Sequence, residues 1–228
     1  MISASMPSIE SGVHWTCGLI RQDQEWQAWC AGVLSADETA RAAKFLMPHV
    51  AACYRGSHGA LRAWLSSHLG IAPQALQFVK DRLGKPELAP KHCAFNLSHS
   101  DAYWSAAVHP CPDAQVGIDI EALAKFTDAW PDLARHILSA DELSALAQET
   151  PESYAAILAR LWTRKEALLK AIGVGLRRSM CSLTVGWSEA PVVIHAPDAD
   201  GNAASWTIHD LAPLPDGLAG ALAVRDLR

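Results

Sequence analysis

The sequence predicts an α+β protein made of two similar lobes, and three observations support this. Helical and strand-like patterns come in runs rather than in strict alternation, which favours α+β over a doubly wound parallel sheet. The phrase Leu34-Ser35-Ala36-Asp37-Glu38 returns 104 residues later as Leu138-Ser139-Ala140-Asp141-Glu142. A long apolar helical pattern that ends at a glycine, Gly70 or Gly173, follows each copy. We therefore expect two pseudo-symmetric lobes, each a small antiparallel sheet with packed helices.

The first lobe is expected to span residues 1–112 and to open with an alternating strand. Ser35 and Glu38 form a capping box, the Ser-x-x-Glu pattern that starts a helix. Helices are expected over 24–33, 35–46 and 51–69, and strands over 13–20, 76–80, 94–97 and 103–108, the last two joined by a turn at 98–101.

The second lobe is expected to span residues 113–228, after the proline-rich segment Pro110-Cys111-Pro112. Ser139 and Glu142 repeat the capping box. Helices are expected over 128–137, 139–148 and 152–171, and strands over 115–121, 183–187, 192–195, 205–211 and 219–224.

Composition narrows the class of protein. Half of the 228 residues are hydrophobic, and the net charge is -5, which argues against a general nucleic-acid binder. The six cysteines are scattered with no C-x-x-C spacing, so a zinc ribbon is not indicated and reduced, buried thiols are expected. The sequence shows neither a signal peptide nor an apolar run long enough to cross a membrane. We expect a cytoplasmic monomer.

Two carboxylates stand two residues apart in Gly117-Ile118-Asp119-Ile120-Glu121. Side chains two apart on a strand share one face, so Asp119 and Glu121 are expected on an open face and the isoleucines inside. Adjacent carboxylates favour a cation between them, and Mg²⁺ takes oxygen ligands. Taken alone, these five residues are more typical of a solvated strand face.

Glu166 and Lys170 lie one turn apart on a helix that is apolar around much of its circumference. Such a pair is usually a solvated surface pair, but buried charges need a partner or a metal. If the pair is buried, Glu166 is expected to act as a third metal ligand or as a proton acceptor. Lys170 is then expected to neutralise the charge of a phosphate. Residues 160–178 carry six basic residues against one acidic, which suits an anionic ligand.

Two further segments carry polar groups. Asn96-Leu97-Ser98-His99-Ser100 follows a strand-like run, and free N–H groups and hydroxyls at a strand end can hold phosphate oxygens. A polar turn with a satisfied histidine is the commoner outcome for such a stretch. Gly84-Lys85-Pro86 is typical of a turn.

These elements, in this order, resemble the surfactin-type 4'-phosphopantetheinyl transferases over about residues 84–176. The matching segments are Gly84-Lys85-Pro86, 96–100, 117–121, and Trp162 through Lys170 continuing to Leu176. The resemblance implies a pseudo-dimer of two α+β halves. It also implies transfer of the phosphopantetheine arm of coenzyme A to a serine of an acyl or peptidyl carrier protein, with release of adenosine 3',5'-bisphosphate.

By that resemblance, Mg²⁺ is bound by Asp119, Glu121 and Glu166, and catalysis falls to Glu166 and Lys170. Contacts with coenzyme A are implied for Arg41, Arg55, Lys85, Pro86, Ser98, His99, Lys165 and Lys170.

The chain departs from the family pattern at residues 49–55, where relatives usually carry an arginine-rich run and only Arg55 is basic. Arg41 and Lys44 lie upstream, and Glu38 stands where a basic residue is common. Two alternatives therefore stay open. One is a non-catalytic protein that binds coenzyme A or a carrier, and the other is a different Mg²⁺-dependent enzyme acting on a nucleotide pyrophosphate.

Overall fold

The computed structural model describes residues 12–127 and 130–225. The first lobe begins with strand β1 (His14–Leu19) and three helices. These are α1 (Gln24–Val33), α2 (Ala36–Ala42) and α3 (Pro48–Leu69). Four strands complete it: β2 (Phe78–Lys80), β3 (Pro86–Leu88), β4 (Ala94–Ser100) and β5 (Tyr103–His109).

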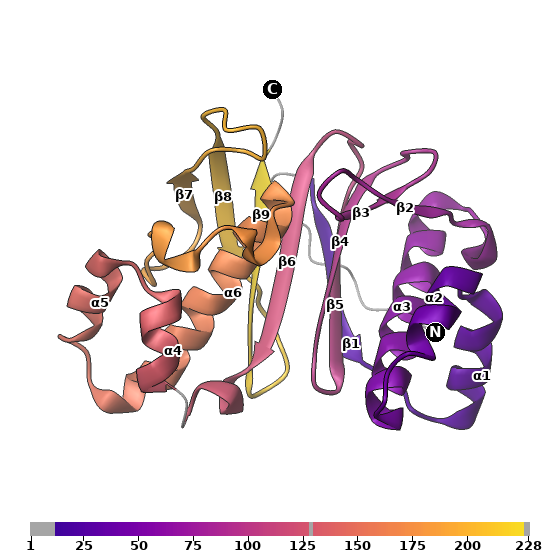
Figure 1. Ribbon diagram of the computed structural model, residues 1–228, viewed down its shortest axis with the longest axis horizontal. Helices are drawn as coiled ribbons and strands as arrows, with labels where there is room; N and C mark the ends of the chain where they lie inside the picture. Colours follow the sequence, from indigo (N-terminus) through magenta and orange to yellow (C-terminus); the bar gives the residue numbers. More distant parts are fainter. Residues whose placement is uncertain (1–11, 128–129, 226–228) are drawn as a thin grey trace.

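The second lobe repeats this order with one strand fewer after its helices (Figure 1). Strand β6 (Gln115–Ala122) leads into helices α4 (Trp130–Ile137), α5 (Ala140–Leu146) and α6 (Tyr154–Ile172). Strands β7 (Val192–His195), β8 (Ser205–Asp210) and β9 (Leu218–Arg225) follow. The segment between β5 and β6, residues 110–114, contains the boundary that the sequence predicts; the assignment of separate domains stays a prediction.

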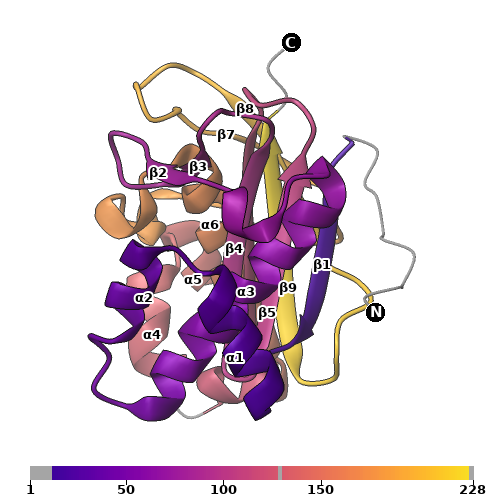
Figure 2. The same cartoon turned by 90° about the vertical axis from the view of Figure 1, so that its right-hand side faces the viewer.

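In each lobe the first strand pairs with the last. The sheet of the first lobe has the order β1-β5-β4, and that of the second lobe the order β6-β9-β8-β7. All these pairings are antiparallel. The two sheets meet in the middle of the molecule, and the helices lie to the outside (Figures 1 and 2). The predicted α+β class and the two pseudo-symmetric lobes are confirmed.

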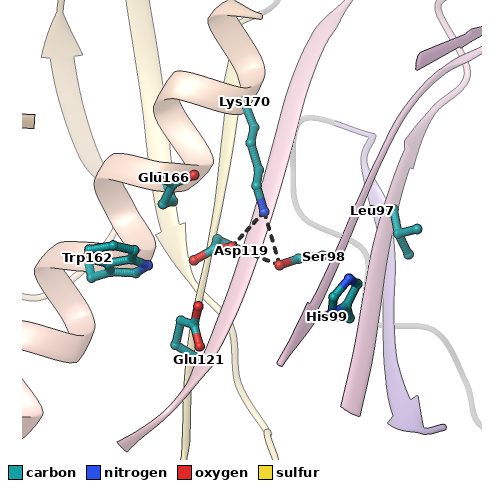
Figure 3. A pocket seen from close by; sticks show the side chains of 8 residues that line it. All are labelled: Leu97, Ser98, His99, Asp119, Glu121, Trp162, Glu166 and Lys170. Atoms are coloured by element: carbon teal, nitrogen blue, oxygen red, sulfur yellow. Dashed lines mark hydrogen bonds and ion pairs between the residues drawn. The ribbon is translucent and has the colours of Figure 1, made fainter. Parts of the chain in front are cut away.

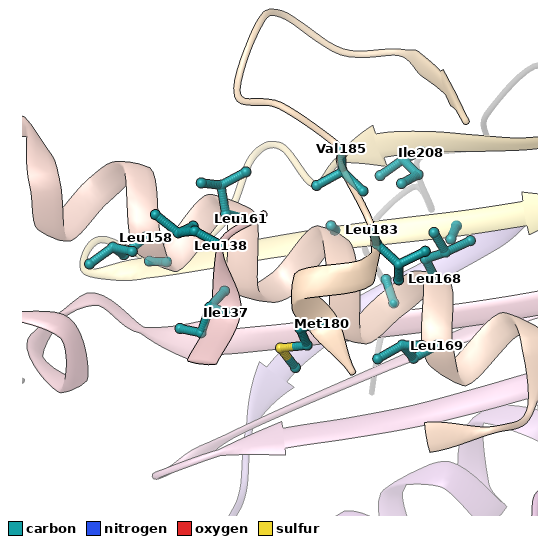
Figure 4. Packing of buried hydrophobic residues seen from close by; sticks show 14 of the residues in the cluster. Ile137, Leu138, Leu158, Leu161, Leu168, Leu169, Met180, Leu183, Val185 and Ile208 are labelled. Atoms are coloured by element: carbon teal, nitrogen blue, oxygen red, sulfur yellow. The ribbon is translucent and has the colours of Figure 1, made fainter. Parts of the chain in front are cut away.

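Three apolar cores hold this arrangement together. One lies in each lobe, and a third, which includes Val13, Ile118, Ile120 and Leu222, joins the two sheets. The core of the second lobe is built around α6, where Leu161, Leu168 and Leu169 pack on neighbouring elements (Figure 4). The isoleucines that flank Asp119 are fully buried, as the strand alternation predicts.

A ladder of polar side chains joins the lobes. Among the described strands, none pairs with the outer edge of β6, and β4 lies alongside it. Asn96 Oδ1 accepts the N–H of Ile118 at 3.0 Å. Two rungs follow at a spacing of two residues, from Ile120 N to Ser98 Oγ at 3.4 Å and from Ala122 N to Ser100 Oγ at 3.1 Å. Side chains thus satisfy N–H groups that a neighbouring strand would otherwise bind.

Each lobe buries one ion pair between its capping-box glutamate and its long helix. Glu38 caps the N–H of Ser35 and binds Arg62 at 2.7 Å. In the second lobe the Glu142 carboxylate binds Lys165, and both side chains are buried. Arg62 and Lys165 each lie eight residues before the left-handed glycine that ends the helix. Glu38 therefore has a structural role in this chain.

Several predicted elements differ from the structure. Strand β4 runs on to Ser100, so Ser98 and His99 lie within a paired strand rather than in a turn, because Ser98 pairs with Ser105 and His99 with Trp104. Residues 183–187 are not a strand, and β3 was missed. Helix α2 ends at Ala42 rather than 46, and α3 starts earlier, with a proline in its first turn. The predicted start of α4 at residue 128 lies outside the described residues.

The thiols are less uniformly buried than predicted. All six cysteines are free; Cys30 and Cys93 are buried, whereas Cys111 is exposed. Within the described ranges, no helix is both long and apolar enough to span a bilayer.

Gly117 determines how closely α6 approaches β6. A Cβ at this position would overlap the backbone of α6 at the Ala167 oxygen and the Ala171 nitrogen. We predict that Gly117→Ala lowers the free energy of unfolding by at least about 1–3 kcal/mol. The reason is that the backbone of α6 can make room for the methyl group only if the whole helix shifts away from β6. Urea unfolding measures the change.

The matched control is Gly32→Ala. Gly32 lies inside α1, and a Cβ there meets nothing within 4 Å. This change should leave stability unaltered or raise it by about 0.5–1 kcal/mol. Equal effects of the two substitutions would contradict the close-contact explanation.

Candidate active site

A groove between the lobes contains two adjoining pockets. We call the first the acidic pocket; its volume is about 290 Å³, and it is lined by Leu97, Ser98, His99, Asp119, Glu121, Trp162, Glu166 and Lys170 (Figure 3). We call the second the hairpin pocket; its volume is about 580 Å³, and its walls come from the β2–β3 turn, β4 and the segment after α6. Leu97 and Lys170 line both pockets, so the two are continuous.

The acids of β6 face α6 rather than open solvent. Asp119 is only 3% exposed, which corrects the expectation of an open strand face. Its Oδ1 accepts hydrogen bonds from Ser98 Oγ at 2.8 Å and from Lys170 Nζ at 2.6 Å. Glu121, also on this face, accepts a hydrogen bond from Ser100 Oγ at 2.6 Å. The serines of the ladder therefore hold both carboxylates.

Helix α6 presents a stripe of three functional side chains to the acidic pocket. Trp162, Glu166 and Lys170 are spaced four residues apart, which places them on one helix face (Figure 3). Among the described residues, Glu166 has no hydrogen-bond or ion-pair partner. Strand β6 and helix α6 thus bring Asp119 and Glu121 into one pocket with Glu166, which is 45 or more residues away in sequence.

Burial changes the acid–base behaviour of this group. It raises the pKa of Asp119, against the opposing influence of the Lys170 ammonium. Burial also raises the pKa of Glu166, and the negative charge of Asp119 adds to the shift. Desolvation and the nearby Lys170 charge lower the pKa of His99 at the pocket rim. Ionising all the acids together is therefore unfavourable until a further positive charge arrives.

The residues present fit a divalent cation. Asp119 Oδ2 is buried and has no hydrogen-bond partner among the described residues, so one ligand oxygen is already desolvated and unused. In the described parts of the chain, no three carboxylate, imidazole or thiol side chains are placed so that they could hold a metal ion by themselves. Mg²⁺ does not require such a set, because it commonly takes one or two carboxylates and completes its shell with water and phosphate oxygens.

The hairpin pocket places Lys85 and Pro86 on the wall that the first lobe contributes. Lys85 Nζ donates to the carbonyl oxygens of Val116 at 3.0 Å and Ala171 at 3.1 Å. Burial lowers the pKa of this lysine to about 8. Lys85 lines the pocket, but its ammonium ties the β2–β3 hairpin to the second lobe.

Three of the predicted coenzyme A contacts do not line these pockets. Lys165 is fully buried and donates to Glu142 and to the carbonyls of Ile137 and Met180, so its assignment as a ligand contact was wrong. The guanidinium of Arg41 lies 5.9 Å from the ring centroid of Tyr54.

Arg55 is the third predicted contact that lies outside the two pockets, and it donates a hydrogen bond to Gln27 Oε1 at 3.3 Å. The positive charge of residues 160–178 is likewise partly used inside the fold, because Arg164 binds Asp210 at 2.7 Å.

Four residues at the site were not selected from the sequence. Asn96 and Ser100 belong to the ladder, and their spacing of two around Ser98 would have indicated it, had the strand been extended to residue 100. Lys125, four residues after Glu121, donates to its carboxylate at 2.7 Å. Trp162, which was named from the sequence only as the start of a matching segment, also lines the acidic pocket.

Comparison with known proteins decides the family. Residues 115–223 match the model of the 4'-phosphopantetheinyl transferase superfamily. The 4'-phosphopantetheinyl transferase HetI of Nostoc sp. is 32% identical over 217 residues, covering 93% of this chain and 87% of that protein. This chain belongs to the 4'-phosphopantetheinyl transferase superfamily. The predicted family and enzyme class are confirmed.

Other members align over shorter stretches. The 4'-phosphopantetheinyl transferase of Bacillus subtilis is 31% identical over 140 residues, covering 60% of each chain. AcpT of Salmonella typhimurium is 37% identical over 120 residues, covering 52% of this chain and 59% of its own. Among solved structures, a holo-ACP-synthase from Plasmodium yoelii covers 49% of this chain, at 16% identity and a TM-score of 0.33.

The raised pKa of Glu166 leads to a stability prediction for the transferase. A carboxyl whose pKa is higher in the folded state stabilises the fold at low pH and loses that contribution as pH rises through the folded pKa. Glu166→Gln should therefore raise the thermal midpoint of the metal-free protein at pH 8, and raise it less at pH 5. Calorimetry at both values measures this.

Glu189→Gln serves as the control, because Glu189 is exposed. It should change the midpoint little at either pH. If Glu166→Gln raised the thermal midpoint by the same amount at pH 5 and at pH 8, ionisation of Glu166 would not be the cause.

Proposed function

We propose that the transferase moves the phosphopantetheine arm of coenzyme A to a serine of an acyl or peptidyl carrier protein, with Mg²⁺ bound in the acidic pocket. Adenosine 3',5'-bisphosphate is the second product. The observation that carries the proposal is the convergence of Asp119, Glu121, Glu166 and Lys170 in one pocket that continues into a larger one.

The residues that line the two pockets support one placement of coenzyme A along the groove. The nucleotide half lies in the hairpin pocket, beside Lys85 and Pro86. The pyrophosphate lies where the two pockets meet, at Lys170. Ser98 and His99 contribute contacts from β4, and the carrier serine approaches from the acidic pocket.

The charges of the site match the needs of phosphoryl transfer, in which catalysis rests on positioning and on stabilising charge. Asp119, Glu121 and Glu166 would hold the metal, and its positive charge would stabilise negative charge that develops in the transfer. Lys170, held by Asp119 and Ser98, stabilises negative charge on the leaving bisphosphate. Glu166 has no other partner among the described residues and accepts the proton of the attacking serine, directly or through water.

A non-catalytic binding protein is less well supported. Its support was the shortage of arginines at residues 49–55, whereas the acidic pocket is lined by three carboxylates and by Lys170, which is paired with Asp119. A different nucleotide enzyme would produce other products, so product analysis with coenzyme A separates it from the proposed transfer.

We predict that Asp119→Asn and Glu166→Gln each lower kcat/KM for the transfer about 10²- to 10⁴-fold, since each removes a charge that the reaction uses. The assay is mass spectrometry of an apo carrier protein incubated with coenzyme A and Mg²⁺. Removing the metal with a chelator should stop the mass gain, and added Mg²⁺ should restore it.

Glu189→Gln is again the matched control and should retain full activity, because Glu189 is exposed and lines neither the acidic pocket nor the hairpin pocket. Full activity in either acidic-pocket variant would refute the role assigned to that residue. No mass gain across several apo carriers would refute the proposed transfer itself.

A further inference from the structure

A second lysine contacts the acids from the end of β6. Lys125 lies in the short helix η2 (Leu123–Phe126) that follows β6. Its Nζ donates to Glu121 Oε2 at 2.7 Å and to Ser100 Oγ at 2.8 Å. It also lies 3.6 Å from Asp101 Oδ1 across the lobe boundary. The side chain is 44% exposed, whereas that of Glu121 is 19% exposed.

The ion pair with Lys125 competes with a metal ion for the carboxylate of Glu121. Oε2 of Glu121 already accepts bonds from Ser100 and Lys125. On the neighbouring acid, Lys170 binds Asp119 in the same way. The three carboxylates that line the acidic pocket thus face two ammonium groups, and the formal charge of these five groups is -1 when all of them are ionised. A divalent cation that enters alone would have to displace or oppose both lysines.

We propose that Lys125 is a positioning residue that holds Glu121 against binding of free metal and so couples metal binding to coenzyme A. The inference rests on the proposed function. A cation alone gains little from Glu121 while Lys125 holds it. Coenzyme A brings negative phosphate oxygens into the groove, and these compensate the charge of both the metal and the lysines.

The experiment measures metal affinity, not turnover. Mn²⁺ is titrated into the protein without coenzyme A, and free Mn²⁺ is followed by electron paramagnetic resonance. Lys125→Met should bind Mn²⁺ roughly three- to five-fold more tightly than wild type, the effect of one partly exposed charge. With coenzyme A present the difference should shrink. Lys125→Arg, which keeps the charge, should restore the wild-type affinity.

Two controls separate competition from structural effects, since Lys125 also bridges the lobes. Lys91→Met removes a lysine from the analogous i,i+4 pair with Glu87, which does not line the acidic pocket, and should leave Mn²⁺ affinity unchanged. In a Glu121→Gln background, Lys125→Met should no longer tighten Mn²⁺ binding, because the contested carboxylate is gone.

The outcomes are distinct. Unchanged or weaker Mn²⁺ binding in Lys125→Met overturns the inference and leaves the proposed transfer intact. The same holds if Lys125→Met still tightens Mn²⁺ binding in the Glu121→Gln background. A wild-type protein that binds no Mn²⁺, with or without coenzyme A, overturns the metal assignment and the inference together.

Discussion

The ladder between β4 and β6 is the constraint on which the site depends. Ser98 and Ser100 each bind a backbone N–H of β6 and at the same time hold a carboxylate of the acidic pocket. The contacts that join the lobes are therefore also the contacts that orient the acids. A hydroxyl can do both because it donates one hydrogen bond and accepts two. The distance between the lobes and the geometry of the acids cannot vary independently.

The rest of the fold supplies the stability that offsets the cost of burying the acids of the site. Burial raises the pKa of both Asp119 and Glu166, so the ionised cluster opposes folding. Stability comes from elsewhere, from three apolar cores and from a buried ion pair in each lobe. Such a pair is costly to break, because removing one partner leaves a buried charge. Part of the basic charge near the motif serves this framework rather than the ligand.

Local patterns in the sequence correctly predicted the features that neighbouring residues determine, such as strand faces and helix ends. Strand alternation identified the buried isoleucines of β6, the capping boxes located α2 and α5, and glycines located the ends of α3 and α6. Local patterns could not show that Lys165 turns inward to Glu142, because that choice depends on a partner distant in sequence. The extent of β4 was missed for a similar reason. Its serines look like a turn until β6 supplies donors for their hydroxyls.

The two lobes share a fold but not their chemistry. Matching the glycine that ends α3 to the one that ends α6 aligns Arg62 with Lys165, so the structural ion pairs correspond. The same alignment sets Ala63 and Ser67 opposite Glu166 and Lys170. The first lobe thus has no counterpart of the reactive helix face. The second lobe carries the carboxylates and the lysine of the acidic pocket, and the first lobe contributes the opposite wall through Leu97, Ser98 and His99 of β4.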